Sequence, residues 1–145
     1  MAPFVSEAVA AVLAGGTDLF LARAAWLHWT GSDRAPDLLF GYSLNPSVIR
    51  GHERGIVPLA AFAVCLTVGV AAATAAKGAA GLALVHVSGV FILGSIPWTA
   101  LHLTIAWFNW PKALVPPHRR GESGSVTEWW RQRAAGDKGR GRDAR

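Results

Sequence analysis

The chain has 145 residues, of which 52% are hydrophobic and only 16% are charged. This composition is too apolar for an ordinary soluble domain of this length, and it predicts an all-α integral membrane protein. The net charge is +5, and residues 111–145 carry all of that excess, with nine Lys and Arg against four Asp and Glu. A single cysteine excludes an intrachain disulfide, and the high Ala, Gly and Arg content points to a bacterial source.

Residues 4–29 form the first apolar segment and the most ambiguous one. The segment is long enough to cross a bilayer, which takes about 20 residues, but it carries Asp18 and Arg23. A central Asp costs about 2.5–3.5 kcal/mol on insertion scales, and the surrounding apolar side chains offset that cost without compensating Arg23. Either the helix spans and turns its acidic face into a bundle, which is the favoured interpretation, or Gly15-Gly16 break it and Thr17 caps a second, interfacial helix.

Residues 31–55 form a polar connection with the turn signals Pro36, Gly41 and Asn45-Pro46. His52-Glu53-Arg54 lie at its end, just before the next apolar segment. We expect these three residues to form a solvated charged collar, with a ligand-binding or gating collar as the alternative.

Residues 56–76 contain no charged side chain and form the most secure transmembrane helix of the chain. Small residues recur at every fourth position on two roughly opposite sides. This spacing lets helix backbones approach closely, so the helix is predicted to lie between two neighbours. The two sets are Ala61, Cys65, Gly69 and Ala73, and Ala63, Thr67, Ala71 and Ala75.

Residues 79–110 form the third apolar segment, which is longer than a bilayer requires and is predicted to kink at Pro97. Trp107 and Trp110 form an aromatic belt at its end. Polar side chains recur along one face of this helix. They are Ser88, Ser95, Thr99, His102 and Asn109.

Residues 111–145 form a basic tail that we place in the cytoplasm by the positive-inside rule. Pro111, Pro116 and Pro117 predict that it leaves the membrane in an extended conformation. Ser125 and Glu128 match a capping box, so a short amphipathic helix is expected at about 126–135, ended by Gly136 and followed by disorder.

The tail also carries the side chains that we expect to meet partners. Trp129 and Trp130 suit a partner's groove or a bilayer surface, and anionic lipid head groups are expected at Arg119, Arg120, Arg131 and Arg133. Nucleic-acid binding is not expected, because the tail lacks a folded basic module. The resulting location is the bacterial cytoplasmic membrane, with the connection at 31–55 on the cytoplasmic side and Lys77 facing outward.

Polar side chains within the apolar segments are candidate functional residues because they are costly to hold there. They are Asp18, Arg23, His86, Ser95, Thr99 and His102. One hypothesis pairs Asp18 with His102 in a proton- or cation-linked translocator. The other, which is favoured, pairs Asp18 with Arg23 or a partner subunit while His102 bonds a neighbouring carbonyl group.

No cofactor or metal is expected. His86 and His102 are sixteen residues apart, about 160° around a helix, so they cannot both ligate one haem between helices. A single-His haem site shared with another chain stays open.

The sequence contains no phosphate loop, nucleophile elbow or H-E-x-x-H motif, so catalysis is not expected. The leading interpretation is a non-catalytic accessory or scaffolding subunit of a larger membrane complex, in which other membrane subunits and the lipid bilayer are its partners. The alternative is a homo-oligomeric pore or translocator. Three spans with an outside N-terminus and a charged cytoplasmic tail resemble the general layout of some phage holins.

Overall fold

The fold was analysed in a computed structural model, which describes residues 2–35, 46–76 and 81–140, with side chains for 9–35, 46–76 and 81–133. The described chain is helical and contains no strand, which confirms the all-α prediction. The helices are α1 (Ala2–Thr30), α2 (Pro46–Arg54), α3 (Ile56–Ala75), α4 (Gly81–Phe108) and α5 (Ser125–Arg140), with short 3-10 turns η1 (Lys112–Leu114) and η2 (Pro117–Arg119).

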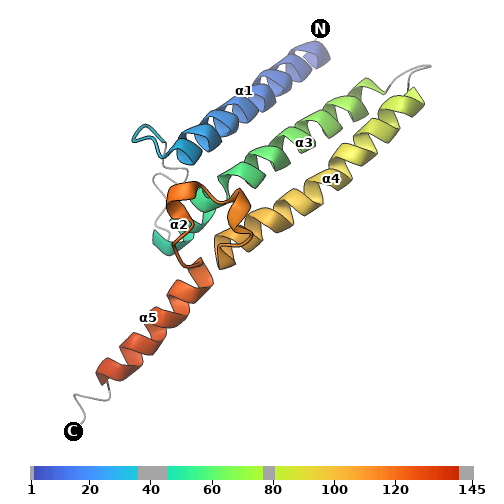
Figure 1. Cartoon of the computed structure of the whole chain (residues 1–145). Coiled ribbons are helices and arrows are strands. Elements are labelled where there is room, and N and C mark those ends of the chain that lie inside the picture. The colour runs from blue at the N-terminus through green and yellow to red at the C-terminus, as the bar shows by residue number, and fades with distance from the viewer. Residues whose placement is uncertain (1, 36–45, 77–80, 141–145) are drawn as a thin grey trace.

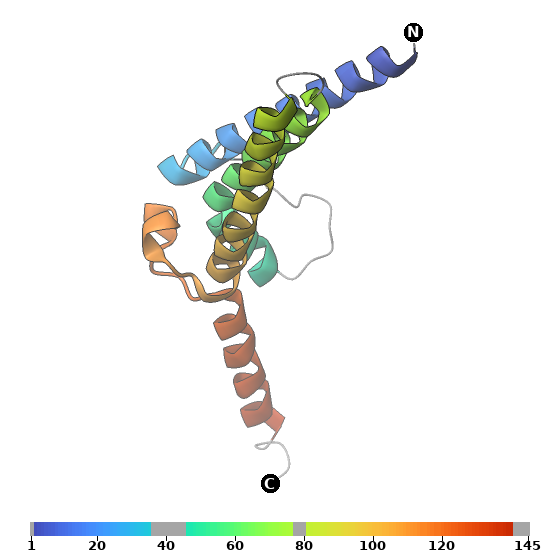
Figure 2. The same cartoon turned by 90° about the vertical axis from the view of Figure 1, so that its right-hand side faces the viewer.

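Three of these helices, α1, α3 and α4, are long and apolar enough to cross a membrane. They lie side by side with α3 in the middle, as the two small-residue faces predicted (Figure 1). Neighbouring helices are antiparallel, so the end of α1, the start of α3 and the end of α4 lie together. The N-terminus lies at the opposite end, and α5 projects away from the three helices (Figures 1 and 2).

The first helix is continuous, so the alternative with a break at Gly15-Gly16 is wrong. Thr17 does not cap a new helix, because its hydroxyl donates to the Leu13 carbonyl oxygen (2.9 Å) within the same helix. α1 instead ends after Thr30 at Gly31, whose φ of 67° is a left-handed conformation that glycine adopts without steric cost. Backbone bonds from Gly31 to His28 and from Ser32 to Leu27 complete a Schellman motif.

Small residues decide how closely α3 approaches its neighbours. A Cβ atom at Gly69 would lie 2.7 Å from Ile92 Cγ1 and 3.1 Å from its backbone nitrogen, so this glycine lets α3 and α4 touch. On the other side, Ala24 and Ala25 of α1 form a small core with Ile56. Both contacts depend on side chains that are small or absent, as expected for helix association in lipid.

α1 and α3 separate from each other farther from that core. Between the first half of α1 and the second half of α3 lies an apolar cleft of about 720 Å³. Its lining consists of Ala10, Ala11, Ala14 and Gly15 from α1 and Leu66, Thr67, Val70, Ala71, Thr74 and Ala75 from α3. The second small-residue face of α3 therefore borders an open cleft over most of its length.

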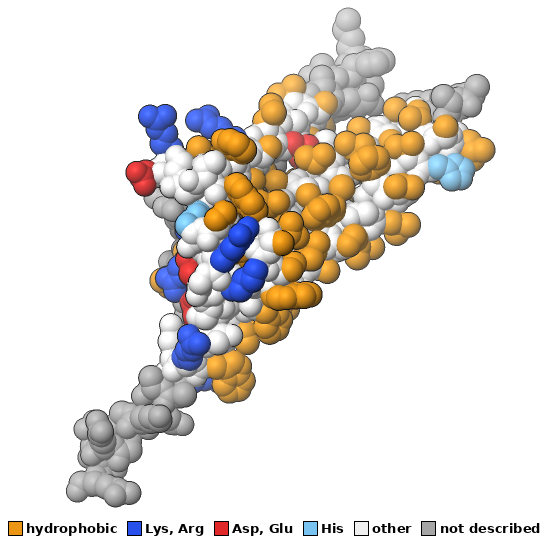
Figure 3. Space-filling model, in the orientation of Figure 1, with side chains coloured by type: hydrophobic (Ala, Val, Ile, Leu, Met, Phe, Trp, Pro, Cys, Tyr) orange, Lys and Arg blue, Asp and Glu red, His pale blue; other side chains and the backbone are white. Residues whose placement is uncertain are grey.

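Apolar side chains cover most of the visible surface of the three long helices, whereas charged side chains gather at the end where the tail begins (Figure 3). Trp26 is 68% exposed and Trp110 is 63% exposed, and both lie at this same end. Such a distribution is typical of helices surrounded by lipid, with tryptophans near the interface.

Several expected boundaries differ from the structure. The connection at 31–55 contains the helix α2, which the turn signals did not predict. The tail helix runs from Ser125 to Arg140, so Gly136 does not end it and residues 137–140 are helical rather than disordered. Pro97 lies inside the continuous helix α4. The predictions for Lys77, for the turns at Pro36 and Gly41, and for disorder at 141–145 concern residues outside the described ranges.

The segment between α4 and α5 folds back instead of leaving extended. Its two 3-10 turns bring Val115, which is fully buried, and Pro116 into the interior. The tail therefore covers the end of the helical layer, and this arrangement creates the polar site described below.

Candidate functional site

Charged residues from three parts of the chain meet where α2, the end of α4 and the tail come together. We call this cluster the polar junction. It comprises Arg50, His52, Glu53, Arg54, His102, Asn109, Arg119, Glu122, Ser125 and Glu128. Three arginines and three glutamates give it a formal charge of zero, apart from its histidines. The junction joins segments that are more than fifty residues apart in the sequence.

Arg54 is the centre of the polar junction and is completely buried. Its Nη1 donates to Glu122 Oε2 (2.9 Å) and to the Ser123 carbonyl oxygen (2.8 Å). Its Nη2 lies 3.2 Å from Ser125 Oγ, and Glu128 Oε1 is 3.6 Å from Nη1. A guanidinium has five donors in a fixed fork, which suits simultaneous bonding to carboxylates and carbonyl groups. One buried arginine thus holds the end of α2 to the tail.

Two further ion pairs surround Arg54. Arg119 Nη1 lies 2.9 Å from Glu53 Oε2, and Arg50 Nη2 lies 3.0 Å from Glu128 Oε2. The Glu53 side chain is only 7% exposed, so its charge requires a partner in a medium of low dielectric. Each pair connects α2 to the tail, and together with the two ion pairs of Arg54 they hold that segment in place.

Gly51 on α2 and Gly55, which directly follows this helix, let the chain lie against α4. A Cβ at Gly51 would lie 2.9 Å from the Ala106 carbonyl oxygen, and one at Gly55 would lie 2.6 Å from His102 Nδ1. Larger side chains at either position would separate the two helices. The four-residue spacing of these glycines places both on one face of the chain, directed at α4.

The end of α4 is shaped by Asn109, which has a left-handed φ of 55° and is 1% exposed. Asparagine tolerates this conformation better than most residues and commonly follows a helix C-terminus. Its side-chain amide donates to the carbonyl oxygens of Arg119 and Glu122, so it ties down the returning tail. Lys112 Nζ donates to the Arg120 carbonyl oxygen (2.6 Å) and closes the same loop.

His52 and His102 form a hydrogen-bonded pair at the edge of the polar junction. His102 Nδ1 lies 2.8 Å from the Gly55 carbonyl oxygen, which can only accept, so this nitrogen carries a proton. His102 Nε2 then accepts from His52 Nδ1 across 2.9 Å. If both rings were fully protonated, two N–H groups would face each other. The pair therefore holds at most one positive charge without breaking.

This pair should make the protein less stable in acid. Burial lowers the pKa of His52 from its usual 6.5, and repulsion from His102 lowers it further. The unfolded chain then binds the proton more readily, so stability is full above pH 6.5 and is lost as the pH falls through the folded pKa. The midpoint of thermal unfolding should fall more between pH 7.5 and 5 in the wild type than in His52→Gln. Parallel curves for the two proteins would contradict this assignment.

Two predictions about the polar junction were wrong. Glu53 and Arg54 are buried and not part of a solvated collar. The capping box does not form, because Ser125 Oγ donates to the Ser47 carbonyl oxygen (2.6 Å) and Glu128 pairs with arginines of α2. The presence of both Arg and Glu on each of the two flanking segments, α2 and the tail, was the signal that could have indicated this network.

The polar stripe of α4 mainly faces its neighbours. Ser88, Ser95, His102 and Asn109 are all buried, whereas Thr99 is exposed. The hydroxyls of Ser95 and Thr99 donate to carbonyl oxygens within α4, at Ile92 (2.6 Å) and Ser95 (3.1 Å). The hydrogen bonds of these hydroxyl groups are therefore formed within α4, and the residues do not line an open path.

The intramembrane candidates do not meet. The predicted bond from His102 to a neighbouring carbonyl is confirmed, and α3 separates α4 from α1, so Asp18 does not pair with His102. Asp18 is half-buried, Arg23 is exposed, and no ion pair joins them among the described residues. Five residues separate them, which puts them on different sides of a helix. His86 is exposed, and its Nδ1 lies 2.8 Å from the Leu82 carbonyl oxygen.

The packing candidates on α3 differ in their surroundings. Gly69 is buried against α4, Ala61 and Cys65 are half-buried, and Ala73 is exposed. Neither tryptophan of the tail helix is buried, since Trp129 is 40% and Trp130 61% exposed. Arg131 and Arg133 are exposed beside them. Apolar and polar residues do not separate onto opposite faces of α5, so the predicted amphipathic character is wrong.

The four arginines assigned to lipid head groups all have contacts within the chain. Arg119 pairs with Glu53, and Arg120 lies over the ring of Trp29 with Cζ 5.9 Å from its centroid. Arg133 lies over Trp129, with Cζ 3.9 Å from the ring centroid, and Arg131 donates weakly to Ser123 Oγ (3.5 Å). Lipid binding at these four arginines stays a prediction.

Comparison with family models, curated proteins and solved structures found no match. The chemistry of the polar junction therefore has to be inferred from its geometry. Its arginines and glutamates are paired, whereas Arg54 Nε and Asn109 Oδ1 are buried without a hydrogen-bond partner. No group of three or more His, Cys, Asp or Glu side chains in the described ranges could hold a metal ion. Such a network can hold the tail in position and respond to pH.

Proposed function

We propose that the protein is a non-catalytic accessory or scaffolding subunit of a larger complex in the bacterial cytoplasmic membrane. In this proposal α1, α3 and α4 all cross the bilayer. The polar junction and the tail lie in the cytoplasm, because the tail carries the excess of Lys and Arg. The antiparallel order of the three helices is compatible with this topology, with the N-terminus outside.

The observation that carries the proposal is the position of Asp18. Helical periodicity places it on the same face as Ala11, Ala14 and Gly15, which line the cleft between α1 and α3. It has no ion pair within the described chain. A carboxylate at this depth is costly, and pairing with a group on another protein offsets that cost. The cleft and the acid together suit a transmembrane helix of another subunit that carries a polar or basic side chain.

The polar junction supports a structural role for the chain. Its ion pairs hold the tail across the ends of the helices, so α5 projects from a fixed base (Figure 2). Trp129 and Trp130 are exposed on this projecting helix, and tryptophan is enriched at protein interfaces. The chain thus presents one surface for a partner within the membrane and a second outside it.

Native mass spectrometry of the tagged protein, extracted from its own membrane in mild detergent, tests the proposal. A stoichiometric complex with another membrane protein is expected. Filling the cleft with Ala14→Leu and Ala71→Leu together should reduce the complexed fraction about tenfold or more, because overpacking costs about 1–3 kcal/mol. Val12→Leu is the matched control, since Val12 is 73% exposed on α1 and does not line the cleft.

A pure homo-oligomer in the same experiment would contradict the subunit assignment. It would support the pore or translocator alternative, in which Asp18 of each copy faces the other copies. Asp18→Asn and His102→Ala would then be expected to reduce a pH-dependent flux in vesicles. Unchanged flux in both variants would reject the translocator as well.

A further inference from the structure

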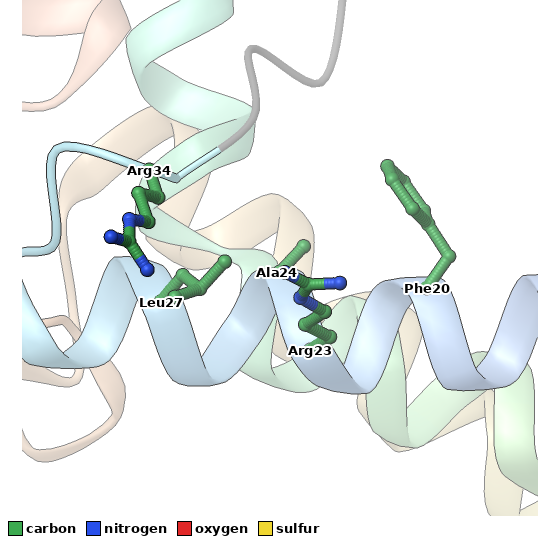
Figure 4. Close-up of a pocket in the computed structure, with 5 residues that line it drawn as sticks. All are labelled: Phe20, Arg23, Ala24, Leu27 and Arg34. Atoms are coloured by element: carbon green, nitrogen blue, oxygen red, sulfur yellow. The ribbon is translucent and has the colours of Figure 1, made fainter.

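Two arginines converge on a small pocket at the end of α1. The pocket has a volume of about 150 Å³ and is lined by Phe20, Arg23, Ala24, Leu27 and Arg34 (Figure 4). Phe20, Arg23, Ala24 and Leu27 follow helical spacing and share one face of α1. The Schellman motif at Gly31 and a further turn bond from Ala35 to Ser32 bring Arg34 back alongside that face. In Figure 4 its side chain reaches toward Leu27.

Neither guanidinium has an acidic partner within the described chain. Arg50, Arg54 and Arg119 are each paired with a glutamate, but no ion pair is formed by Arg23 or Arg34. Asp33, which precedes Arg34, is exposed and does not pair with it. Two positive charges therefore border one pocket whose remaining lining is apolar. This arrangement is complementary to an anion that carries a hydrocarbon group.

The packing of α1 against α3 places this pocket at the edge of the bilayer. Ala24 and Ala25 contact Ile56, where the charge-free run of α3 begins. The head-group region therefore lies at the level of Ala24, one residue from Arg23. Arginine at this depth keeps its charge in the interface while its aliphatic part lies against apolar surface. The neighbouring Trp26, which is 68% exposed, is typical of this level.

We propose that Arg23 and Arg34 together bind the phosphate of an anionic phospholipid, with an acyl chain lying along Phe20. Guanidinium groups form charge-assisted, often bidentate hydrogen bonds to phosphate. A zwitterionic lipid binds less tightly, because its ammonium group would lie near two positive charges. The site rests on the proposed membrane insertion of α1, but it does not depend on any protein partner.

The purified full-length chain in a neutral detergent provides the test. Phosphatidylglycerol, phosphatidylcholine or inorganic phosphate is titrated in, and binding is followed by native mass spectrometry and by the midpoint of thermal unfolding. We expect tight binding of phosphatidylglycerol alone. Arg23→Gln with Arg34→Gln should weaken it about thirtyfold, and each single change about fivefold. If the double variant does not fold, the two single variants still test the site.

Lys138→Gln with Arg140→Gln is the matched control, because it removes the same charge from the end of α5, away from the pocket and from the arginines predicted to meet lipid head groups. This variant should bind phosphatidylglycerol as the wild type does. Equal weakening in the two double variants would overturn the proposal in favour of general attraction to a basic chain. Equal protection by inorganic phosphate would reassign the pocket to free anions, and undiminished binding in the α1 variant would refute the site. The cleft variants Ala14→Leu and Ala71→Leu leave this assay unchanged, so it is independent of the subunit proposal.

Discussion

Replacing Arg54 with methionine is expected to lower the free energy of unfolding by about 3 kcal/mol. Breaking a buried ion pair from one side costs about 3–5 kcal/mol, because the remaining charge is left buried without a partner. The lower end applies here because Glu122, one of the two acidic partners, retains 34% side-chain exposure and can be rehydrated. Thermal or denaturant unfolding of the purified protein in detergent measures the effect.

The matched control for this change is Arg131→Met, which removes an exposed arginine and should shift stability by less than about 0.5 kcal/mol. Adding Glu122→Gln to the Arg54 variant should recover part of the loss, because the carboxylate that has lost its partner is then removed. If Arg54→Met unfolds together with the wild type, the ion-pair network does not stabilise the fold.

Gly124→Ala is expected to release the tail from the end of α4. The added Cβ would lie 2.6 Å from Phe108 Cα and would overlap the backbone carbonyl group of Trp107. Overpacking costs about 1–3 kcal/mol, and the upper end is expected because backbone atoms cannot rotate away. Once the tail is released, trypsin should cut rapidly after Arg119 and Arg120, and limited proteolysis followed by mass spectrometry measures that rate.

Gly121→Ala provides a control three residues away in the same segment. A Cβ there would meet no heavy atom within 4 Å, so this variant should keep the wild-type cleavage rate. Equal rates for Gly124→Ala and the wild type would mean that the tail does not pack as closely on α4 as described. Faster cleavage in both variants would indicate a general effect of losing glycine in this loop.

Arg54 and Gly124 both determine how the tail is held against the helices. The ion pairs of Arg54 supply the attraction, and the absent side chain at Gly124 supplies the space. If α5 presents Trp129 and Trp130 to a partner, as we propose, either change should weaken that contact without altering the cleft between α1 and α3. The polar junction would then be separable from the membrane-embedded surface.

Several structural features of this protein could be predicted from its amino-acid sequence. Long apolar runs predicted three helices that could cross a membrane, because about 20 apolar residues in a row have few other stable conformations. Small residues at every fourth position of residues 56–76 predicted that this helix lies between two others. The polar stripe on residues 79–110 correctly marked one face of α4, most of which is buried. Each of these features depends on local spacing along one segment.

The polar junction could not be predicted from the spacing of residues within one segment, because its partners lie far apart in the sequence. Arg54 and Glu122 are 68 positions apart, and Arg50 and Glu128 are 78 apart. Each looks like an ordinary solvated charge within its own segment, and Ser125 with Glu128 looks like a helix cap. These arginines and glutamates form ion pairs only because the tail turns back, and the ion pairs offset the cost of burying their charges. Likewise, Arg23 and Arg34 share a pocket only because the turn at Gly31 reverses the chain.

The sequence alone therefore determined the three long helices and their apolar character, since both follow from the free energy of single segments in lipid or water. The tertiary structure decided which charges are buried, where the tail lies and which polar groups remain without a partner. Pairing between distant segments sets these properties, and its energy depends on distances and dielectric surroundings that no single segment specifies.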